Sequence, residues 1–327
     1  MYKLSFILPC YNVEYFITEC LDSLLNQDIP YNEYEIICIN DCSTDGTRDI
    51  ILSYQARYEN IILIDHTENK TAGGARNSGI DVAKGKYIWF VDPDDMIFTN
   101  CLSELLNQME SEQLDILMFN FDAVRETSKN TIEVKDTYQQ SLVYSGLDYI
   151  EKYFFKQLSK ITIVWQQIYR KSHIAEHEIL YPEIRVGQDG IFSWQAFFAA
   201  KRVQSIDKRF YIHRLNEFST TAKILVADVL IARYVLFALE VNSILQNSKI
   251  LPEFIRSDLI STEKWAVNGF CKKVIELSSS ETKLFVQYLR REYSRVMKLN
   301  TLNRKTRVAM RLARVNGLLF RLFCIKQ

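Results

Sequence analysis

Short apolar runs alternate with amphipathic stretches through the first 120 of the 327 residues of this chain. The apolar runs have the composition of buried strands, and the stretches between them carry apolar residues at the three- and four-residue spacing of helices. Elements that alternate at this period form right-handed crossovers and a doubly wound, mainly parallel sheet. The expected strands are residues 3–8, 34–39, 61–65, 87–91 and 114–119, and the expected helices are 13–26, 44–58, 72–83 and 100–112.

The pattern changes twice after this region. It loosens between about 120 and 220, and beyond 225 it is almost wholly helical, with few helix breakers. The sequence therefore predicts an α/β domain followed by a C-terminal α-helical module. The middle region should contain strands at 119–124 and 204–213 and helices at 147–156 and 190–200, and the last region should contain helices at 227–246, 252–277, 281–297 and 305–323.

Composition indicates a cytoplasmic protein with reduced thiols. No run approaches the roughly 20 apolar residues that span a bilayer, and the first residues lack the pattern of a signal peptide. The seven cysteines are scattered, odd in number and without a Cys-x-x-Cys pair, so neither a zinc site nor a disulfide framework is expected.

Charge is distributed unevenly, although the net charge is zero. Residues 283–327 contain twelve Lys or Arg and one Glu, and residues 304–323 mix cations with Val, Leu, Met and Phe at helical spacing. Such a helix can lie on an anionic membrane surface. It can equally pack on the rest of the chain or on a second subunit. Nucleic acid is not expected as a partner, because no recognition motif accompanies the charge.

Three aspartates follow the apolar run 87–91: Asp92, Asp94 and Asp95. Like charges packed this closely at a strand end are destabilising unless something positive lies among them. Asp-x-Asp offers hard oxygen ligands to Mg²⁺ or Mn²⁺ and leaves coordination positions for the oxygens of a diphosphate. The alternative is an Asp-rich turn with a helix cap at Asp95.

Two further segments carry candidate binding groups, one directly after an expected strand and one opening an expected helix. Asp41, after the second strand, can accept hydrogen bonds from a base or a ribose, although residues 40–47 also suit an ordinary turn before a helix. Arg76, in a small-residue stretch, can face a diphosphate or pair internally with Asp92 or Asp94. The glycine patterns of dinucleotide-binding and P-loop proteins are absent, which disfavours both classes.

Four ordered segments resemble the family 2 glycosyltransferases: SFILPCYN at 5–12, INDCSTDGT at 39–47, GARNSG at 74–79 and FVDPDD at 90–95. The resemblance covers residues 3–120 closely and 120–220 loosely. It implies a GT-A fold, with a catalytic domain at 1–220 and an α-helical extension at 221–327. Within that domain, residues 1–120 would form the nucleotide-binding half and residues 121–220 the acceptor-side half.

The same resemblance assigns roles to individual residues. Pro9, Tyr11 and Asn12 would line the nucleotide pocket, Asp41 would bind uracil, Arg76 would belong to the donor site, and Asp92 would contact ribose or metal. Asp94 is the first choice as the ligand of Mn²⁺ or Mg²⁺ and Asp92 the second, while Asp95 has the least defined role.

Inverting transfer also requires a base that takes the proton of the acceptor hydroxyl. The family commonly supplies it from a Glu-Asp pair, and this chain has Gln188 and Asp189 there, so Asp189 is the expected base. The alternative for Asp189 is a helix N-cap.

The sequence leaves two interpretations open for several aromatic and basic residues, and it assigns no functional role to others. His213 and Arg214 resemble a basic or aromatic position near the diphosphate, or form an ordinary strand end. Trp165 would stack on an acceptor sugar or lie in the core. The other histidines, which are His66, His173 and His177, are expected at the surface or in packing.

The expected function is a metal-dependent, inverting hexosyl- or N-acetylhexosaminyltransferase. It would move a sugar from a UDP-sugar to a saccharide or lipid-linked saccharide in surface polysaccharide or glycoconjugate assembly, at the inner face of the cytoplasmic membrane. Two alternatives stay open: a nucleotidyltransferase with a similar metal site, and an inactive binding relative, for which Gln188 is the one indication.

Overall fold

The computed structural model describes residues 2–125, 131–132, 138–154, 161–182, 187–215, 237–247 and 251–273. The chain forms two compact units. The first comprises Met1–Phe154, Ser159–Glu183 and Phe192–Glu217, and the second comprises Phe155–Leu158, Ile184–Ile191 and Phe218–Gln327. The helices expected at 281–297 and 305–323, and with them the basic segment, lie outside the described residues.

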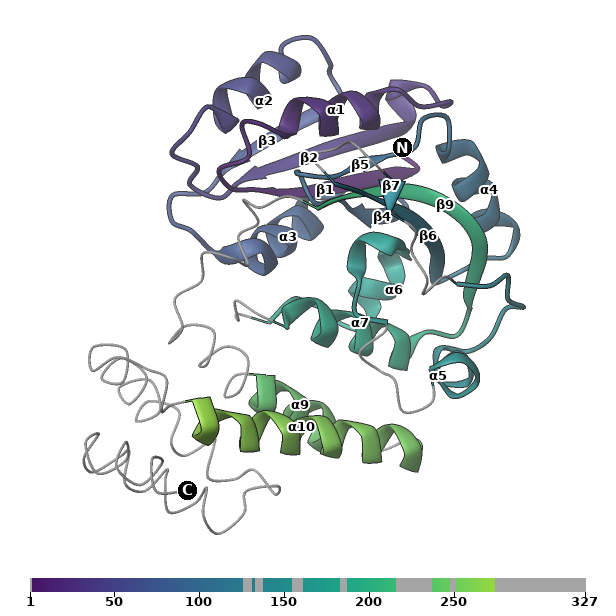
Figure 1. The fold of residues 1–327 in the computed structure, drawn as a ribbon. Coiled ribbons are helices and arrows are strands. Elements are labelled where there is room, and N and C mark those ends of the chain that lie inside the picture. The colour runs from purple at the N-terminus through teal and green to yellow at the C-terminus, as the bar shows by residue number, and fades with distance from the viewer. Residues whose placement is uncertain are drawn as a thin grey trace, which may run out of the picture. The chain divides into compact units, whose positions relative to one another are not determined.

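The first unit contains a sheet whose strand order is β3-β2-β1-β4-β8-β6-β9-β5, with β7 paired to β6 (Figure 1). The strands β3, β2, β1 and β4 are mutually parallel, as the alternation predicts. Beyond β4 the sheet is mixed, because β8 runs antiparallel to both β4 and β6. The strands are β1 (Leu4–Cys10), β2 (Tyr34–Asn40), β3 (Ile61–Asp65), β4 (Tyr87–Phe90), β5 (Met96–Ile97), β6 (Ile116–Arg125), β7 (Thr131–Ile132), β8 (Gln167–Arg170) and β9 (Val203–Leu215).

Helices cover both faces of the parallel part of the sheet (Figure 1). Alternate residues of β1, such as Phe6 and Leu8, join the core that includes α1, α2 and α4. Ile7 points to the other face, where α3 packs. The described helices are α1 (Ile17–Leu25), α2 (Thr47–Gln55), α3 (Thr71–Val82), α4 (Leu102–Ser111), α5 (Gly146–Tyr153), α6 (Lys171–Glu176), α7 (Gln188–Ala199), α9 (Phe237–Asn247) and α10 (Glu253–Lys273).

Gly79 allows α3 to approach the sheet closely. A Cβ atom at this position would lie 2.4 Å from Ile7 Cγ2 and 3.1 Å from Ile39 Cδ1, which is closer than side chains normally pack. A residue without a side chain is therefore required here, and α3 carries Arg76 and Ser78 at a fixed height over β1 and β2.

The long strands β6 and β9 bend together. They pair in parallel, with shifts of register between Met118 and Asn120 and between Asn120 and Phe121. Such irregularities bend a strand and increase its twist, and Figure 1 shows β9 as a strongly curved arrow. Tyr211 and Ile212 of β9 then pair with β5, which directly follows the three aspartates. The bend thus brings residues about 120 positions away in sequence next to the acidic loop.

The second unit is described only in part. There α9 and α10 pack together, and the buried Asn242 Nδ2 donates to Glu263 Oε1 at 3.4 Å. Among the residues that the structure describes, no helix has the length and apolar character needed to cross a membrane.

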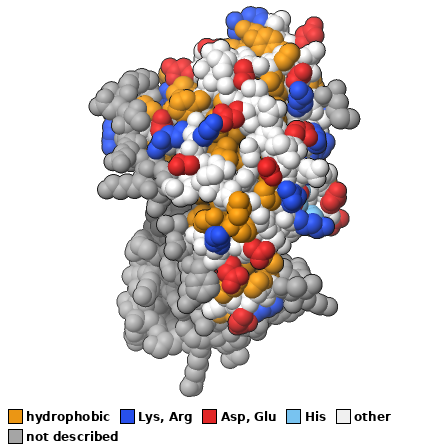
Figure 2. Space-filling view, turned by 90° about the vertical axis from the view of Figure 1, so that its right-hand side faces the viewer, with side chains coloured by type: hydrophobic (Ala, Val, Ile, Leu, Met, Phe, Trp, Pro, Cys, Tyr) orange, Lys and Arg blue, Asp and Glu red, His pale blue; other side chains and the backbone are white. Residues whose placement is uncertain are grey.

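Acidic and basic side chains are interspersed on the face shown in Figure 2. Helix α4 also forms ion pairs, with Lys86 bound to Glu110 and Lys208 to Glu104. This face of the described residues therefore carries no extended patch of a single sign.

Candidate active site

The carboxyl ends of β1, β2 and β4 meet at one edge of the sheet, and the loops that follow them carry most of the predicted donor-site residues. The registers of these strands place Cys10 beside Asn40 and Ile7 beside Phe90. Ligands of doubly wound sheets bind outside this edge. The loops that begin at Tyr11, Asp41 and Val91 therefore form the candidate active site.

Asn12 ties the first of these loops to the second. Its Oδ1 accepts a hydrogen bond from Thr44 N at 2.7 Å, and its backbone N–H donates to Ser43 Oγ at 3.1 Å. Pro9 is buried within β1, whereas Tyr11 is 39% exposed at the start of the loop. Of these three predicted pocket residues, Pro9 is thus enclosed, whereas Tyr11 and Asn12 are both exposed, and Asn12 also fixes the loop that carries them.

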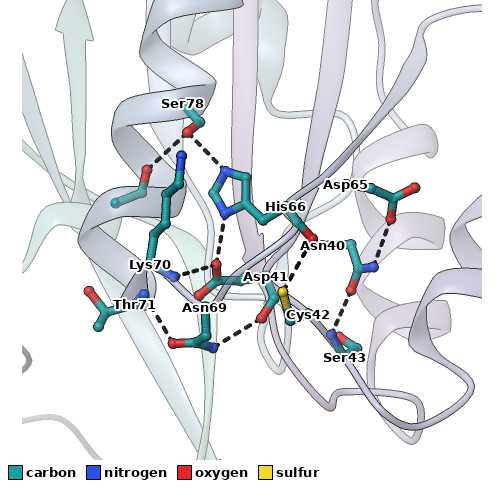
Figure 3. A network of polar contacts seen from close by, with 11 residues as sticks. Asn40, Asp41, Cys42, Ser43, Asp65, His66, Asn69, Lys70, Thr71 and Ser78 are labelled. Carbon is teal, nitrogen blue, oxygen red and sulfur yellow. Dashed lines mark hydrogen bonds and ion pairs between the residues drawn. The ribbon is translucent and has the colours of Figure 1, made fainter.

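Asp41 is buried at the end of β2, with 3% of its side chain exposed. Its Oδ1 accepts hydrogen bonds from Lys70 N at 2.8 Å and from His66 Nδ1 at 2.7 Å (Figure 3). Its backbone carbonyl accepts from Asn69 Nδ2 at 3.0 Å. Asp41 is therefore held in place by the segment between β3 and α3, and it does not serve as an ordinary turn residue.

Arg76 joins α3 to the acidic loop. Its guanidinium is buried, lies over the ring of Tyr181 at 5.3 Å, and donates from Nη2 to Asp92 Oδ1 at 2.7 Å. Of the two alternatives for Arg76, internal pairing is thus observed. The Asp92 side chain stays 30% exposed, so this ion pair borders solvent at the candidate site.

Asp95 is saturated by donors from β9. Its two oxygens accept from Tyr211 OH at 2.8 Å, from Arg214 N at 2.7 Å and from His213 Nδ1 at 3.1 Å. Tyr211 OH in turn accepts from Asp92 N at 3.1 Å. Asp95 therefore neither caps a helix nor faces an ion, because its acceptor positions are occupied by the protein.

Burial raises the pKa of Asp95, although its hydrogen bonds with His213 and Arg214 act in the opposite direction. Burial alone would lower the pKa of His213, but the hydrogen bond and charge of Asp95 outweigh it, and the pKa of His213 is raised. Since Nδ1 of His213 is used by Asp95, Nε2 is the nitrogen left for any other partner.

Trp165 is half-buried and belongs to the packing around this network. Its ring stacks on Tyr211 at 4.4 Å and on His213 at 5.2 Å, and its carbonyl accepts from Trp89 Nε1 at 2.8 Å. One face of Trp165 is therefore used within the protein, and the ring braces the aromatic residues of β9.

Asp94 is the remaining acid of the cluster and is partly exposed. Within the described ranges, no three side chains of His, Cys, Asp or Glu gather in a way that could hold a metal ion by themselves. A site built on Asp94 and Asp92 fits an ion such as Mg²⁺, which commonly takes one or two carboxylates and completes its shell with substrate phosphate oxygens.

Asp189 lies in the first turn of α7, which begins one residue earlier at Gln188. It is therefore inside the helix and not at the capping position. Residues 187–191 belong to the second unit, so the structure leaves the role of Asp189 as a prediction.

Three residues near this edge, two in the loops after β1 and β2 and one at the start of α3, have left-handed backbone conformations. The φ angles are 52° at Asn12, 64° at Cys42 and 66° at Thr71. Such conformations are costly for residues other than glycine, above all for β-branched ones such as Thr71, and they concentrate at ligand sites. Asn100, Gln113 and Glu178, elsewhere in the described chain, have the same conformation, so this strain alone does not mark the site.

His66 is the main residue that the sequence analysis missed. The sequence predicted only a surface or packing role for it, whereas the structure shows a more specific arrangement: 6% of its side chain is exposed, and its ring lies between Asp41 and Ser78. A signal was present, because His66 directly follows β3, and β3 ends at the same edge as β2. The expectation holds for His173, which is buried and bonded to Ala196 O, and for His177, which is exposed.

The family model described as "Glycosyl transferase family 2" matches residues 5–177. The chain belongs to glycosyl transferase family 2. This confirms the family that the four sequence segments indicated. It also favours glycosyl transfer over the nucleotidyl transfer that was left open.

Two relatives show how far the similarity extends. A poly(ribitol-phosphate) beta-glucosyltransferase of Bacillus spizizenii is 36% identical over 64% of this chain and 32% of its own length. The poly(ribitol-phosphate) beta-N-acetylglucosaminyltransferase TarS of Staphylococcus aureus is 27% identical over 84% of this chain and 47% of its own length. The chain thus spans less than half of either relative.

Solved structures confirm the GT-A fold class. Residues 1–349 of S. aureus TarS in complex with UDP-GlcNAc match 98% of this chain and 89% of that one, with a TM-score of 0.65 and 22% identity. A mannosyltransferase of Pyrobaculum calidifontis in complex with GDP-Man and Mn²⁺ matches 98% of this chain and 87% of that one, with a TM-score of 0.55 and 14% identity. At these identities the likeness concerns the fold.

Proposed function

We propose that this chain is a metal-dependent, inverting glycosyltransferase that moves a sugar from a UDP-sugar to an acceptor hydroxyl. The observation that carries the proposal is the pairing of two features on one sheet edge. One is a buried carboxylate, Asp41, suited to a base. The other is the Arg76 and Asp92 ion pair beside Asp94, suited to a diphosphate and an ion.

The donor would be held along this edge. Asp41 would accept the N3–H of uracil, the loop of Pro9, Tyr11 and Asn12 would line the nucleotide, and Asp92 would contact ribose or the ion. Asp94 is the first choice as metal ligand and Asp92 the second. A bound Mg²⁺ or Mn²⁺ would supply charge neutralisation on the departing diphosphate.

Asp189 would act as the base. It would take the proton of the acceptor hydroxyl as that oxygen attacks the anomeric carbon from the side opposite the diphosphate. The product then has inverted configuration. His213, held by Asp95, would lie near the diphosphate, in agreement with the position of this basic residue in the family pattern.

The comparisons support a hexose or N-acetylhexosamine as the transferred sugar, since the relatives are named glucosyl- and N-acetylglucosaminyltransferases. Both are named for a polyol-phosphate polymer, which supports a surface polymer or glycoconjugate as the acceptor. We further propose action in the cytoplasm, with residues 283–327 on the anionic inner face of the membrane. That segment lies outside the described residues.

A screen of UDP-sugars with and without Mn²⁺ tests the proposal. We expect metal-dependent release of UDP with at least one UDP-hexose or UDP-N-acetylhexosamine, and little release with GDP-mannose. Asp94→Ala should abolish metal-dependent UDP binding, whereas Asp81→Ala, an exposed acid at the end of α3, should leave it unchanged. Normal calorimetric binding by Asp94→Ala would remove Asp94 from the metal site.

A further inference from the structure

Asp41 is restrained at one oxygen only. Two N–H groups, from His66 and Lys70, converge on Oδ1 at 2.7 and 2.8 Å. Oδ2 accepts no hydrogen bond within the described part of the chain, and it is not among the fully enclosed polar atoms that lack a partner. The carboxylate is therefore fixed in rotation, and its second oxygen is left without a donor from the described residues and is not fully enclosed, although only 3% of the side chain is exposed.

The imidazole of His66 is itself locked. Its Nε2 lies 2.9 Å from Ser78 Oγ, which is 3.2 Å from Gly74 O, so helix α3 holds the far side of the ring (Figure 3). Since the acceptor at Nδ1 is a carboxylate oxygen, Nδ1 is the donor in that bond. The ring therefore links Asp41 to helix α3 through hydrogen bonds. The same helix carries Arg76, which pairs with Asp92 at the other end of the site.

We propose that His66 is a positioning residue that makes the site select uracil over cytosine by fixing the free oxygen of Asp41. This inference rests on the proposed function, in which Asp41 receives the base. Uracil carries an N–H at N3 and would donate to Oδ2. Cytosine carries a lone pair at N3, which would face the lone pairs of Oδ2 and be left without a partner.

The fixed orientation of the Asp41 carboxylate is what makes this mismatch discriminate between uracil and cytosine. A carboxylate that is free to rotate can turn away from cytosine and let water reach N3, which relieves the repulsion. A carboxylate clamped at Oδ1 cannot do so, and specificity of this kind depends on a penalty against the wrong ligand as well as on attraction to the right one. Sites that hydrogen-bond a ligand group reject analogues lacking it far more strongly than apolar pockets do.

The test measures the dissociation constants of UDP and CDP by calorimetry with Mn²⁺ on the full chain. We expect the wild type to prefer UDP by about 100-fold, as a buried polar mismatch of this size implies. His66→Leu should reduce that ratio by about tenfold or more. His66→Asn places an amide donor near the position of Nδ1 and should keep the ratio within about threefold of wild type.

Matched variants separate positioning from general damage. His173→Leu also removes a buried imidazole, but one bonded to Ala196 O, and its UDP to CDP ratio should equal that of wild type. If His66→Leu does not fold, His66→Gln, whose amide reaches toward Ser78, should lower the ratio in its place.

An unchanged UDP to CDP ratio in a folded His66→Leu or His66→Gln protein would overturn the inference. A drop of this ratio in His66→Asn as large as that in His66→Leu would overturn it as well. In either case, UDP selectivity in the wild type would leave the proposed function standing. A wild type that bound neither nucleotide would overturn the proposed function together with the inference.

Discussion

Removal of the Asp95 carboxylate should destabilise the protein strongly, although this residue has the least defined role in the family pattern. Asp95→Ala leaves Tyr211 OH and Arg214 N–H buried without their acceptor. A buried donor that loses its partner costs about 1–3 kcal/mol, so two such donors give about 4 kcal/mol of lost unfolding free energy. His213 adds little, because a third of its side chain is exposed and can bind water instead.

Urea unfolding followed by tryptophan fluorescence in EDTA measures this loss, since Trp89 and Trp165 both pack against Tyr211. Tyr211→Phe removes one of the two donors, so the double variant should lose about 1–2 kcal/mol less than the sum of the single variants. Asp81→Ala is the exposed control and should change stability by no more than about 0.5 kcal/mol. A loss below about 1 kcal/mol in Asp95→Ala, or strict additivity in the cycle, would refute the buried network as the source of stability.

Three further outcomes are expected. Gly79→Ala should lower stability by about 1–3 kcal/mol in thermal unfolding, because its Cβ would meet Ile7 at 2.4 Å; wild-type stability would show that α3 can shift. The raised pKa of His213 contributes stability that is complete below its unfolded pKa of about 6.5 and is lost as pH rises through the folded value. His213→Gln should therefore flatten the decline of the unfolding free energy with pH above neutral, measured in EDTA. A slope equal to that of the wild type would contradict this. Asp189→Asn should keep UDP binding but lower turnover by about 10²–10⁴-fold, and undiminished turnover would point to another base.

The sequence predicts the parallel part of the sheet well because its signals are local. Each strand from β1 to β4 is an apolar run whose neighbours follow from right-handed crossovers, and β3 has the bounds expected from its pattern. The four-residue strand β8 was not predicted, since it is short and begins with Gln167. Its place between β4 and β6 depends on contacts distant in sequence, which no local pattern encodes.

The same distinction between local signals and contacts distant in sequence explains which residues of the site could be predicted. Asp41 and Asp92 could be found because they follow predicted strands, and Arg76 because it lies in a small-residue stretch that opens a predicted helix. Tyr211 could not, because it reaches Asp95 from 116 positions away through the bend shared by β6 and β9. His66 is an intermediate case: its position after β3 is local, but its contact with Asp41 depends on the pairing of β3 with β2.

The acidic cluster also shows why crowded aspartates are weak evidence for an ion when taken alone. The protein itself supplies partners within this cluster, since Arg76 pairs with Asp92, and His213 and the N–H of Arg214 bind Asp95. Repulsion among the acids therefore does not require a metal. The case for one depends on Asp94, on the exposed side of Asp92 and on oxygens that a diphosphate would add.

A cation at such an incomplete site should bind weakly until the nucleotide supplies the missing ligands. By linkage, Mn²⁺ must then strengthen UDP binding by the same factor by which UDP strengthens Mn²⁺ binding, and we expect about 10–100-fold. Calorimetric titrations of each ligand with and without the other measure both factors. Tight binding of Mn²⁺ in the absence of UDP would mean that the protein alone completes the site, and it would contradict this account of how the charges of Asp92, Asp94 and Asp95 are balanced.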